Sequence, residues 1–261
     1  ITTVSGSSDC ISWWERCHSA EEIACILTQL EQQHLFRVGA RELLRAEWHR
    51  ANRPQKKIPQ GRNHVADVIG RFEGLSFAIA SRIVTRETPE LRAAEIKRAI
   101  AVCNELCKLN NLQSLASVVC AIGNSAVHRL KLSWALLSAA DLAQHQANVD
   151  FCGSENEWGK LRMAADSAKK RCEPCIPYLG TTLTFVSRLL YSRLTRQTPP
   201  LVVSFDRWRE AYKAVALLTS YLIVPYNCLL HQPKDGQEDS INPEEVLAFG
   251  NVLPDQNALF Q

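Results

Sequence analysis

The sequence predicts an all-α fold, and three observations support this. Apolar residues recur at helical spacing through most of the chain, as in 20–35, where Ile23 and Leu27 share one face. Capping residues, prolines and glycines separate these segments. No segment alternates apolar and polar residues as a half-buried strand does, and no internal repeat is present. We therefore expect one helical domain over 20–261, after a partly disordered N-terminal lead-in over 1–19.

Most of the predicted helices have their own boundary signals. Ser19 precedes Glu21 and Glu22, which is an N-cap followed by acidic residues in the first turn. Thr88 and Pro89 open a later helix, because proline suits the first helical position. The predicted helices span 20–35, 40–48, 64–86, 89–108, 112–122, 134–147, 157–170, 182–194 and 204–224.

Composition favours a protein with one sizeable core, and it argues against a nucleic-acid partner and against a membrane span. The chain has 261 residues, of which 46% are hydrophobic, enough to fill a large domain. Its net charge is only +3, so no nucleic-acid partner is predicted. The most apolar windows, 96–122 and 211–228, are interrupted by charged and amide side chains, so no membrane span is predicted.

The ten cysteines are interpreted as free thiols in a reducing cytosol. Several lie in apolar periodic segments, where a thiol behaves as a small hydrophobe. Cys172 and Cys175 form a Cys-x-x-Cys pair, which leaves zinc and redox interpretations open. A zinc site needs a second ligand pair, and neither His145 nor Cys152 supplies one at finger-like spacing. No metal and no other cofactor is predicted.

Motifs for covalent chemistry are absent from the sequence. It contains no glycine-rich phosphate loop, no Gly-x-Ser-x-Gly and no His-Glu-x-x-His, and its seven histidines are scattered. Acidic pairs such as Glu21-Glu22 and Glu244-Glu245 stand at predicted helix starts, where the helix dipole explains them. The residues therefore favour a helical protein that acts by binding rather than as an enzyme.

Four segments, in order, carry a family resemblance. Residues 24–31 read Ala-Cys-Ile-Leu-Thr-Gln-Leu-Glu, and 71–76 read Arg-Phe-Glu-Gly-Leu-Ser. The segment 109–134 opens with Leu-Asn-Asn-Leu and closes with Arg-Leu-Lys-Leu-Ser-Trp. Residues 174–180 read Pro-Cys-Ile-Pro-Tyr-Leu-Gly. Together they resemble the catalytic domain of Ras guanine-nucleotide exchange factors (RasGEF) of the Son-of-sevenless type, over about 20–260.

The resemblance implies a fold and a function. Members of the family are helical bowls with a protruding helical hairpin, here about 183–212, which opens the nucleotide site of a small GTPase. The expected partner is a Ras-family GTPase of Ras, Rap or Ral type, from which GDP is released. The resemblance also implies a cytoplasmic protein, part of a larger multidomain chain that is recruited to membranes through other domains.

The same resemblance assigns candidate site residues. Three hairpin residues match the catalytic positions: Ser187, Arg188 and Tyr191. Residues that match GTPase-facing positions are Cys25, Thr28, Ala116, Gly123, Trp134, Trp158, Tyr178 and Leu179. Residues expected to belong to the scaffold are Leu27, Trp48, Leu130 and Pro177.

The hairpin departs from the family pattern and keeps two further interpretations open. Active members carry a glutamate where this chain has Tyr191, and often a leucine where it has Ser187. Tyrosine presents no carboxylate at neutral pH, and Arg188 and Arg193 make the segment basic. The chain is therefore interpreted as an active exchanger or, alternatively, as a pseudo-exchange domain that binds a GTPase as a scaffold. A third interpretation is an unrelated helical scaffold without a GTPase partner.

Overall fold

A computed structural model describes residues 12–45, 63–191 and 205–226. Within these ranges the all-α prediction is confirmed: no strand is present, and Asn111 and Ile176 form an isolated parallel bridge. None of the described helices combines the length and hydrophobicity that crossing a bilayer requires. In chain order the helices are α1 (Ser12–Arg16), α2 (Ala20–Leu35), α3 (Ala40–Arg45), α5 (His64–Thr85), α6 (Pro89–Lys108), α7 (Leu112–Ile122), α8 (Ser125–His128), α9 (Lys131–Ala135), α10 (Ala139–Cys152), α11 (Gly159–Lys170), α12 (Leu179–Tyr191) and α14 (Phe205–Tyr221).

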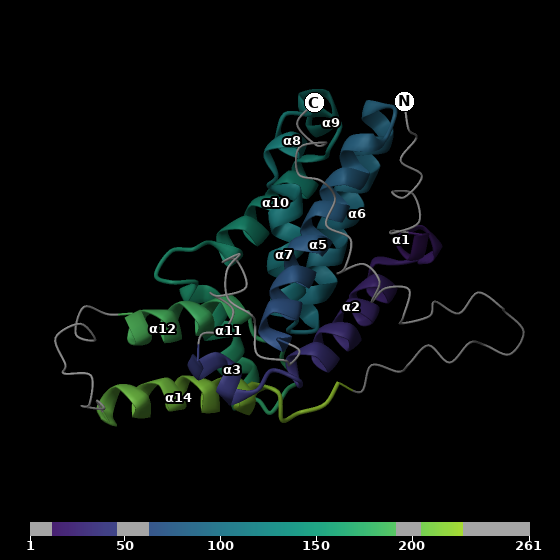
Figure 1. The fold of residues 1–261 in the computed structure, drawn as a ribbon. Coiled ribbons are helices and arrows are strands. Elements are labelled where there is room, and N and C mark those ends of the chain that lie inside the picture. Colours follow the sequence, from purple (N-terminus) through teal and green to yellow (C-terminus); the bar gives the residue numbers. More distant parts are fainter. Residues whose placement is uncertain (1–11, 46–62, 192–204, 227–261) are drawn as a thin grey trace, which may run out of the picture.

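The centre of the fold is α7, which packs against α5 and α6. Every residue of α7 except Cys120 is buried, including the polar residues Gln113, Ser114 and Ser117, so the helix is enclosed on almost all sides. Figure 1 shows α5, α6 and α7 side by side in the long body of the molecule. A large apolar cluster fills this body and includes Leu106 and Leu115, neither of which has exposed surface. Burial of each such side chain stabilises the fold by about 1.5–3 kcal/mol.

Two polar contacts tie α2 to this body. Arg71 on α5 donates from Nη2 to Glu31 Oε1 at 3.3 Å, and both side chains are buried. Asn111, the N-cap of α7, donates from Nδ2 to Thr28 Oγ1 at 3.0 Å. These four residues come from three of the family-like segments, and the contacts give them a role in holding the helices in register.

The first helix, α1, lies within the predicted lead-in. Its two tryptophans, Trp13 and Trp14, are each only 1% exposed. Arg98 on α6 donates to the carbonyl oxygens of Trp14 at 2.7 Å and Cys17 at 2.5 Å, at a helix end where carbonyls lack intrahelical partners. Residues 12–17 therefore pack as part of the helical body, which the interpretation as a lead-in did not anticipate.

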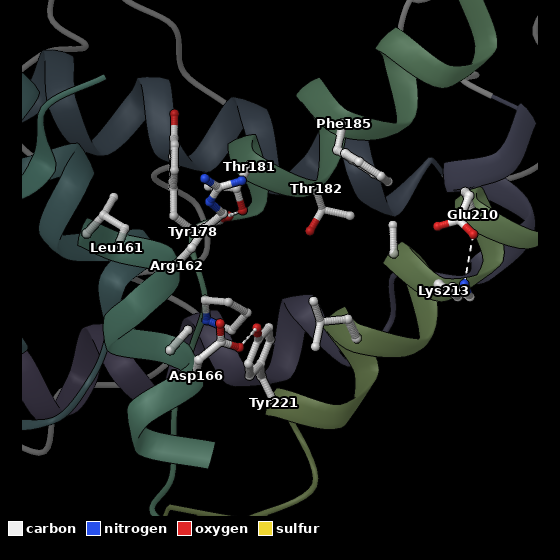
Figure 2. Close-up of a pocket in the computed structure, with 14 residues that line it drawn as sticks. Leu161, Arg162, Asp166, Tyr178, Thr181, Thr182, Phe185, Glu210, Lys213 and Tyr221 are labelled. Carbon is white, nitrogen blue, oxygen red and sulfur yellow. Dashed lines mark hydrogen bonds and ion pairs between the residues drawn. The ribbon is translucent and has the colours of Figure 1, made fainter. Parts of the chain in front are cut away.

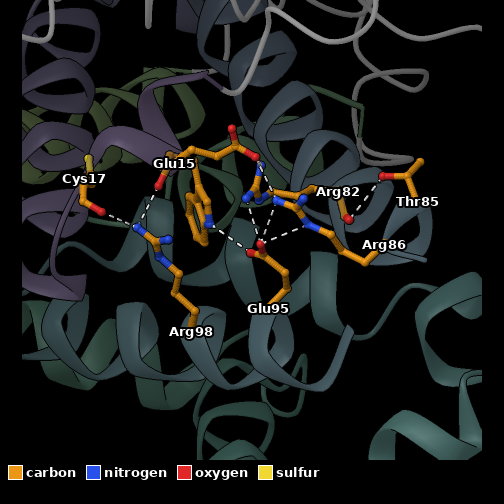
Figure 3. A network of polar contacts seen from close by, with 8 residues as sticks. Glu15, Cys17, Arg82, Thr85, Arg86, Glu95 and Arg98 are labelled. Carbon is orange, nitrogen blue, oxygen red and sulfur yellow. Dashed lines mark hydrogen bonds and ion pairs between the residues drawn. The ribbon is translucent and has the colours of Figure 1, made fainter. Parts of the chain in front are cut away.

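A network of charged side chains fastens α1 to α5 and α6 (Figure 3). Arg82 donates to Glu15 Oε1 at 2.8 Å and to Glu95 Oε1 at 2.7 Å, and Arg86 binds the same two carboxylates. Trp14 Nε1 donates to Glu95 Oε2 at 3.2 Å. Burial alone would raise the pKa of Glu95, but the hydrogen bonds and charges of the arginines outweigh it and lower that pKa.

The helices α12 and α14 form an antiparallel pair that projects from the body (Figure 1). A second apolar cluster holds them together through Val186 and Val215, and joins them to Leu43 of α3 and Val65 of α5. This pair is the protruding hairpin that the resemblance implied. Its connection, 192–204, lies outside the described residues.

Several boundaries differ from the prediction. The helix α11 begins at Gly159 rather than 157, α12 begins at Leu179 rather than 182, and α14 ends at Tyr221 rather than 224. The helix expected over 134–147 is divided into α9 and α10, because Ser138 caps α10: its Oγ accepts from the Asp141 amide at 3.1 Å, and the Asp141 carboxylate accepts from the Ser138 amide at 3.3 Å. The helix expected over 40–48 is described only as far as Arg45, and Trp48 lies outside the described residues.

Candidate functional site

The Pro-Cys-Ile-Pro-Tyr-Leu-Gly segment is held against the turn between α6 and α7. The Ile176 amide donates to Asn110 O at 3.0 Å, and the Leu112 amide donates to Ile176 O at 2.9 Å. The Leu179 amide donates to Gln113 Oε1 at 2.9 Å. Asn110 takes a left-handed conformation (φ 52°), which asparagine tolerates better than most residues. The Leu-Asn-Asn motif thus fixes the start of the hairpin.

Three aromatic side chains meet at the end of this segment. The Tyr178 ring lies 5.8 Å from Phe72 on α5 and 5.6 Å from Trp158, measured between ring centroids. We call Phe72, Trp158 and Tyr178 the aromatic cluster. Each is half-buried, and burial raises the pKa of the Tyr178 hydroxyl. Partly exposed aromatic rings in a fixed arrangement are typical anchors of protein interfaces.

Gly180 allows the Tyr178 ring to take its place. A Cβ atom at position 180 would lie 2.5 Å from Cζ and 2.6 Å from the hydroxyl oxygen of Tyr178. Carbon atoms in contact are normally about 3.5–4.0 Å apart. The ring therefore packs directly over the backbone at Gly180, and any larger residue there has to displace it.

A left-handed turn presents the other side of the cluster. Asn156, Glu157 and Trp158 have φ values of 49°, 55° and 56°, a conformation that costs L-residues about 1–2 kcal/mol each. The turn brings Trp158 against Tyr178, and it brings the Glu157 carboxylate into an ion pair with Arg188 on α12. Strain of this kind persists where surrounding contacts compensate for it, often at functional sites.

The structure brings some of the predicted GTPase-facing residues together and buries others. Trp158 and Tyr178 are in contact, as described above. Thr28 has no exposed surface, and its hydroxyl donates to Ala24 O at 2.7 Å. Ala116 is 6% exposed and Leu179 is 2% exposed. These three side chains are therefore buried in the structure and present almost no surface to a partner.

The remaining predicted contacts are Gly123 at the end of α7, Trp134 on α9 and Cys25 on α2. Gly123 ends α7 and is exposed. Trp134 on α9 donates from Nε1 to Val127 O at 2.9 Å, and its ring lies 5.2 Å from that of His145 on α10. Figure 1 places α9 at the opposite end of the body from the hairpin. Cys25 on α2 is half-buried.

The three hairpin candidates occupy the second half of α12. Ser187 is half-buried, and the Arg188 side chain is 59% exposed while paired with Glu157. Tyr191 is the last residue of α12, and its side chain lies outside the described part of the chain. Arg188 and Tyr191 are three residues apart, so they stand on adjacent turns of the helix.

Thiols near the site have no metal-binding arrangement in the described ranges. Burial raises the pKa of Cys120, and raises that of Cys152 to about 12. In the Cys-x-x-Cys pair, Cys172 is exposed while Cys175 is buried. Among the described residues, no three His, Cys, Asp or Glu side chains are grouped as metal ligands.

Two residues of the site were not singled out from the sequence. Phe72 lies inside the family-like Arg-Phe-Glu-Gly motif, so the motif marked its position without indicating its contact with Tyr178. Nothing in the sequence identified Glu157 as a site residue, because its ion pair with Arg188 depends on a left-handed turn that is seen only in the folded chain.

Comparison with known proteins agrees with the four segments. The RasGEF domain model matches residues 22–209. The chain is 31% identical over 215 residues to Ras guanine nucleotide exchange factor K of Dictyostelium discoideum, covering 79% of this chain and 13% of that protein. It is 34% identical over 164 residues to Ras-specific guanine nucleotide-releasing factor RalGPS1 of Danio rerio, covering 62% and 27%. It is 27% identical over 212 residues to Ras guanine nucleotide exchange factor A of Dictyostelium discoideum, covering 79% and 34%. The chain thus spans between 13% and 34% of the length of these relatives.

Proposed function

Because the chain belongs to the RasGEF domain family, we propose that it promotes GDP release from a Ras-family small GTPase. The observation that carries this proposal is the aromatic cluster at the base of the α12–α14 hairpin. The partner would be of Ras, Rap or Ral type. The reaction would take place in the cytoplasm, where free thiols such as Cys175 stay reduced.

The proposed mechanism is a coupling between two ligands of the GTPase. In it, the aromatic cluster binds an apolar side chain of the GTPase switch region, while the hairpin occupies space beside the nucleotide. A GTPase conformation that binds the exchange factor well then binds GDP and magnesium poorly, and the coupling is reciprocal. No bond is made or broken in this chain.

The hairpin face formed by Ser187, Arg188 and Tyr191 is proposed to meet the nucleotide site. Arg188 is paired with Glu157, so part of its charge is neutralised before a partner arrives. Exposed ion pairs contribute only about 0–1 kcal/mol, and the pair can therefore open at little cost when Arg188 meets a phosphate.

The decisive experiment measures release of a fluorescent GDP analogue from purified Ras, Rap and Ral proteins. Acceleration with at least one of them supports the proposal. The absence of acceleration together with stable binding in a pull-down would select the second candidate, a pseudo-exchange domain. The observation that favours that candidate is Tyr191 in place of the family glutamate.

Tyr178→Ala should weaken GTPase binding by about 2 kcal/mol or more, roughly thirtyfold in Kd, because it removes the central ring of the cluster. Tyr178→Phe is the matched control. It keeps the ring, and no hydrogen bond of the hydroxyl is found among the described residues, so binding should be retained. Titration of the nucleotide-free GTPase measures both, and equal affinity of all three proteins would contradict the assignment.

Tyr191→Glu should raise the rate of GDP release if a negative charge at this position repels phosphate and competes for magnesium. Tyr212→Glu places the same charge on the exposed surface of α14 and serves as the control. The comparison is made in the nucleotide-release assay at matched concentrations. A rate increase in both variants, or in neither, would exclude a specific charge effect at position 191.

A further inference from the structure

A cavity of about 260 Å³ lies between α11 and the two hairpin helices (Figure 2). Tyr178 forms one of its walls, while Phe72 and Trp158 do not line it. The cavity is therefore distinct from the aromatic cluster, although the two share a side chain. It is slightly smaller than the roughly 300–1,000 Å³ typical of drug-sized ligands, and so suits a compact molecule rather than a nucleotide.

The walls of the cavity are mostly apolar and partly exposed to solvent. Leu161 and Ala165 line it from α11, and Phe185 and Leu217 line it from the hairpin. Phe185 is 38% exposed and Leu217 is 44% exposed. A ligand placed between α11 and the hairpin would remove this apolar surface from water, which is the main source of affinity in small-molecule sites.

The charges around the cavity leave one carboxylate without a cation. Lys213 and Glu210 neutralise each other at 2.8 Å. Arg162 is turned toward Asn156, whose carbonyl oxygen accepts from Nη2 at 2.9 Å, and toward Glu157. Asp166 accepts a hydrogen bond from the Tyr221 hydroxyl at 2.5 Å, and no ion pair of Asp166 is found within the described residues.

We propose that this cavity binds a compact organic cation, with an apolar or aromatic body and a protonated amine. The apolar part of the ligand packs between Leu161, Phe185 and Leu217, and its amine pairs with the Asp166 carboxylate. Charge complementarity selects the cation, because Asp166 is the charged lining residue for which no ion pair is found among the described residues. Nothing in this proposal depends on nucleotide exchange.

The test uses tryptamine as the probe, with neutral 3-ethylindole and anionic indole-3-propionate for comparison. Binding is followed on the full chain by the methyl NMR signals of Ala165 and Ala214, both of which line the cavity. We expect tryptamine to shift these signals and to bind more tightly than either comparison compound. No shift, or tighter binding of the anion, would overturn the proposal.

Asp166→Asn keeps an oxygen that can accept from Tyr221 but removes the charge, so it should weaken tryptamine binding about tenfold and leave 3-ethylindole unchanged. Asp150→Asn is the matched control, because Asp150 on α10 is also exposed and accepts one neutral hydrogen bond, from Gln146. Leu217→Trp should fill the cavity and abolish binding of both compounds. Unchanged tryptamine affinity in Asp166→Asn would refute the role of the carboxylate.

Discussion

At the scale of single residues, the site depends on how closely Tyr178 approaches the backbone of Gly180. The ring lies where a β-carbon of residue 180 would be, and its other neighbours, Phe72 and Trp158, keep it there. The resemblance assigned Tyr178 and Trp158 to GTPase-facing positions, and in the structure their rings are in contact. Sequence could not indicate the orientation of the ring, because that follows from contacts between α5, the left-handed turn and the start of α12.

Gly180→Ala should lower the free energy of unfolding by about 1–3 kcal/mol, the usual cost of overpacking, since the ring has to move away. Gly39→Ala is the control, because a Cβ at that position meets nothing within 4 Å. There the change should be neutral, or stabilising by up to about 1 kcal/mol through the unfolded chain. Urea denaturation measures both, and equal effects of the two variants would contradict the close approach.

At the scale of elements, helices with strong local signals were predicted correctly. The bounds expected for α2, α6 and α7 agree with the structure, because periodicity and capping depend on residues that are close together in the sequence. The division between α9 and α10 was missed, although Ser138 and Asp141 form a local capping signal. The left-handed turn at 156–158 could not be predicted, because packing of Trp158 on Tyr178 offsets its strain.

The helix α10 packs on the core only with partly buried apolar side chains, such as Val149 and Phe151, so its cap should matter. Asn148 is the one buried residue of α10. Ser138→Ala should therefore cost about 0.5–2 kcal/mol of stability. The same change at Ser167, an exposed position inside α11, should cost nothing, since alanine is the better helix former. Thermal or urea unfolding compares the two, and an equal loss in both would argue against the cap.

At the scale of the whole molecule, α1 and the hairpin lie on opposite sides of the helical body (Figure 1). The family model begins at residue 22, yet Trp13 and Trp14 are part of the same apolar cluster as α5, α6 and α7. The cluster therefore extends beyond the family-like segment. Both tryptophans fall within the lead-in predicted over 1–19, and they were not singled out from the sequence.

The charged network behind α1 should make stability depend on pH. The pKa of Glu95 is lowered in the folded chain, so its contribution is present above the unfolded value of about 4.3 and is lost as the pH falls through the folded pKa. Glu95→Gln should cost about 1.5–3 kcal/mol at pH 7, the range for hydrogen bonds to charged groups. The difference from the unmodified chain should shrink below about pH 4.

Urea unfolding at several pH values checks this expectation. Glu73→Gln is the control, because Glu73 on α5 is exposed and forms no hydrogen bond or ion pair within the described residues. It should leave the free energy of unfolding at pH 7 unchanged. A difference between Glu95→Gln and the unmodified chain that stays constant from pH 7 to pH 3 would contradict an electrostatic role for Glu95.

The hairpin is held mainly by an apolar cluster that includes Val65 and Val68 of α5 but no residue of α6 or α7, while Tyr221 of α14 belongs to the cluster of the body. Segments held mainly by one cluster can open and close as cooperative units, each with its own free energy. The α12–α14 pair is therefore expected to loosen on warming while α6 and α7 remain folded. The angle between the hairpin and the helical body can then change without unfolding of the central helices.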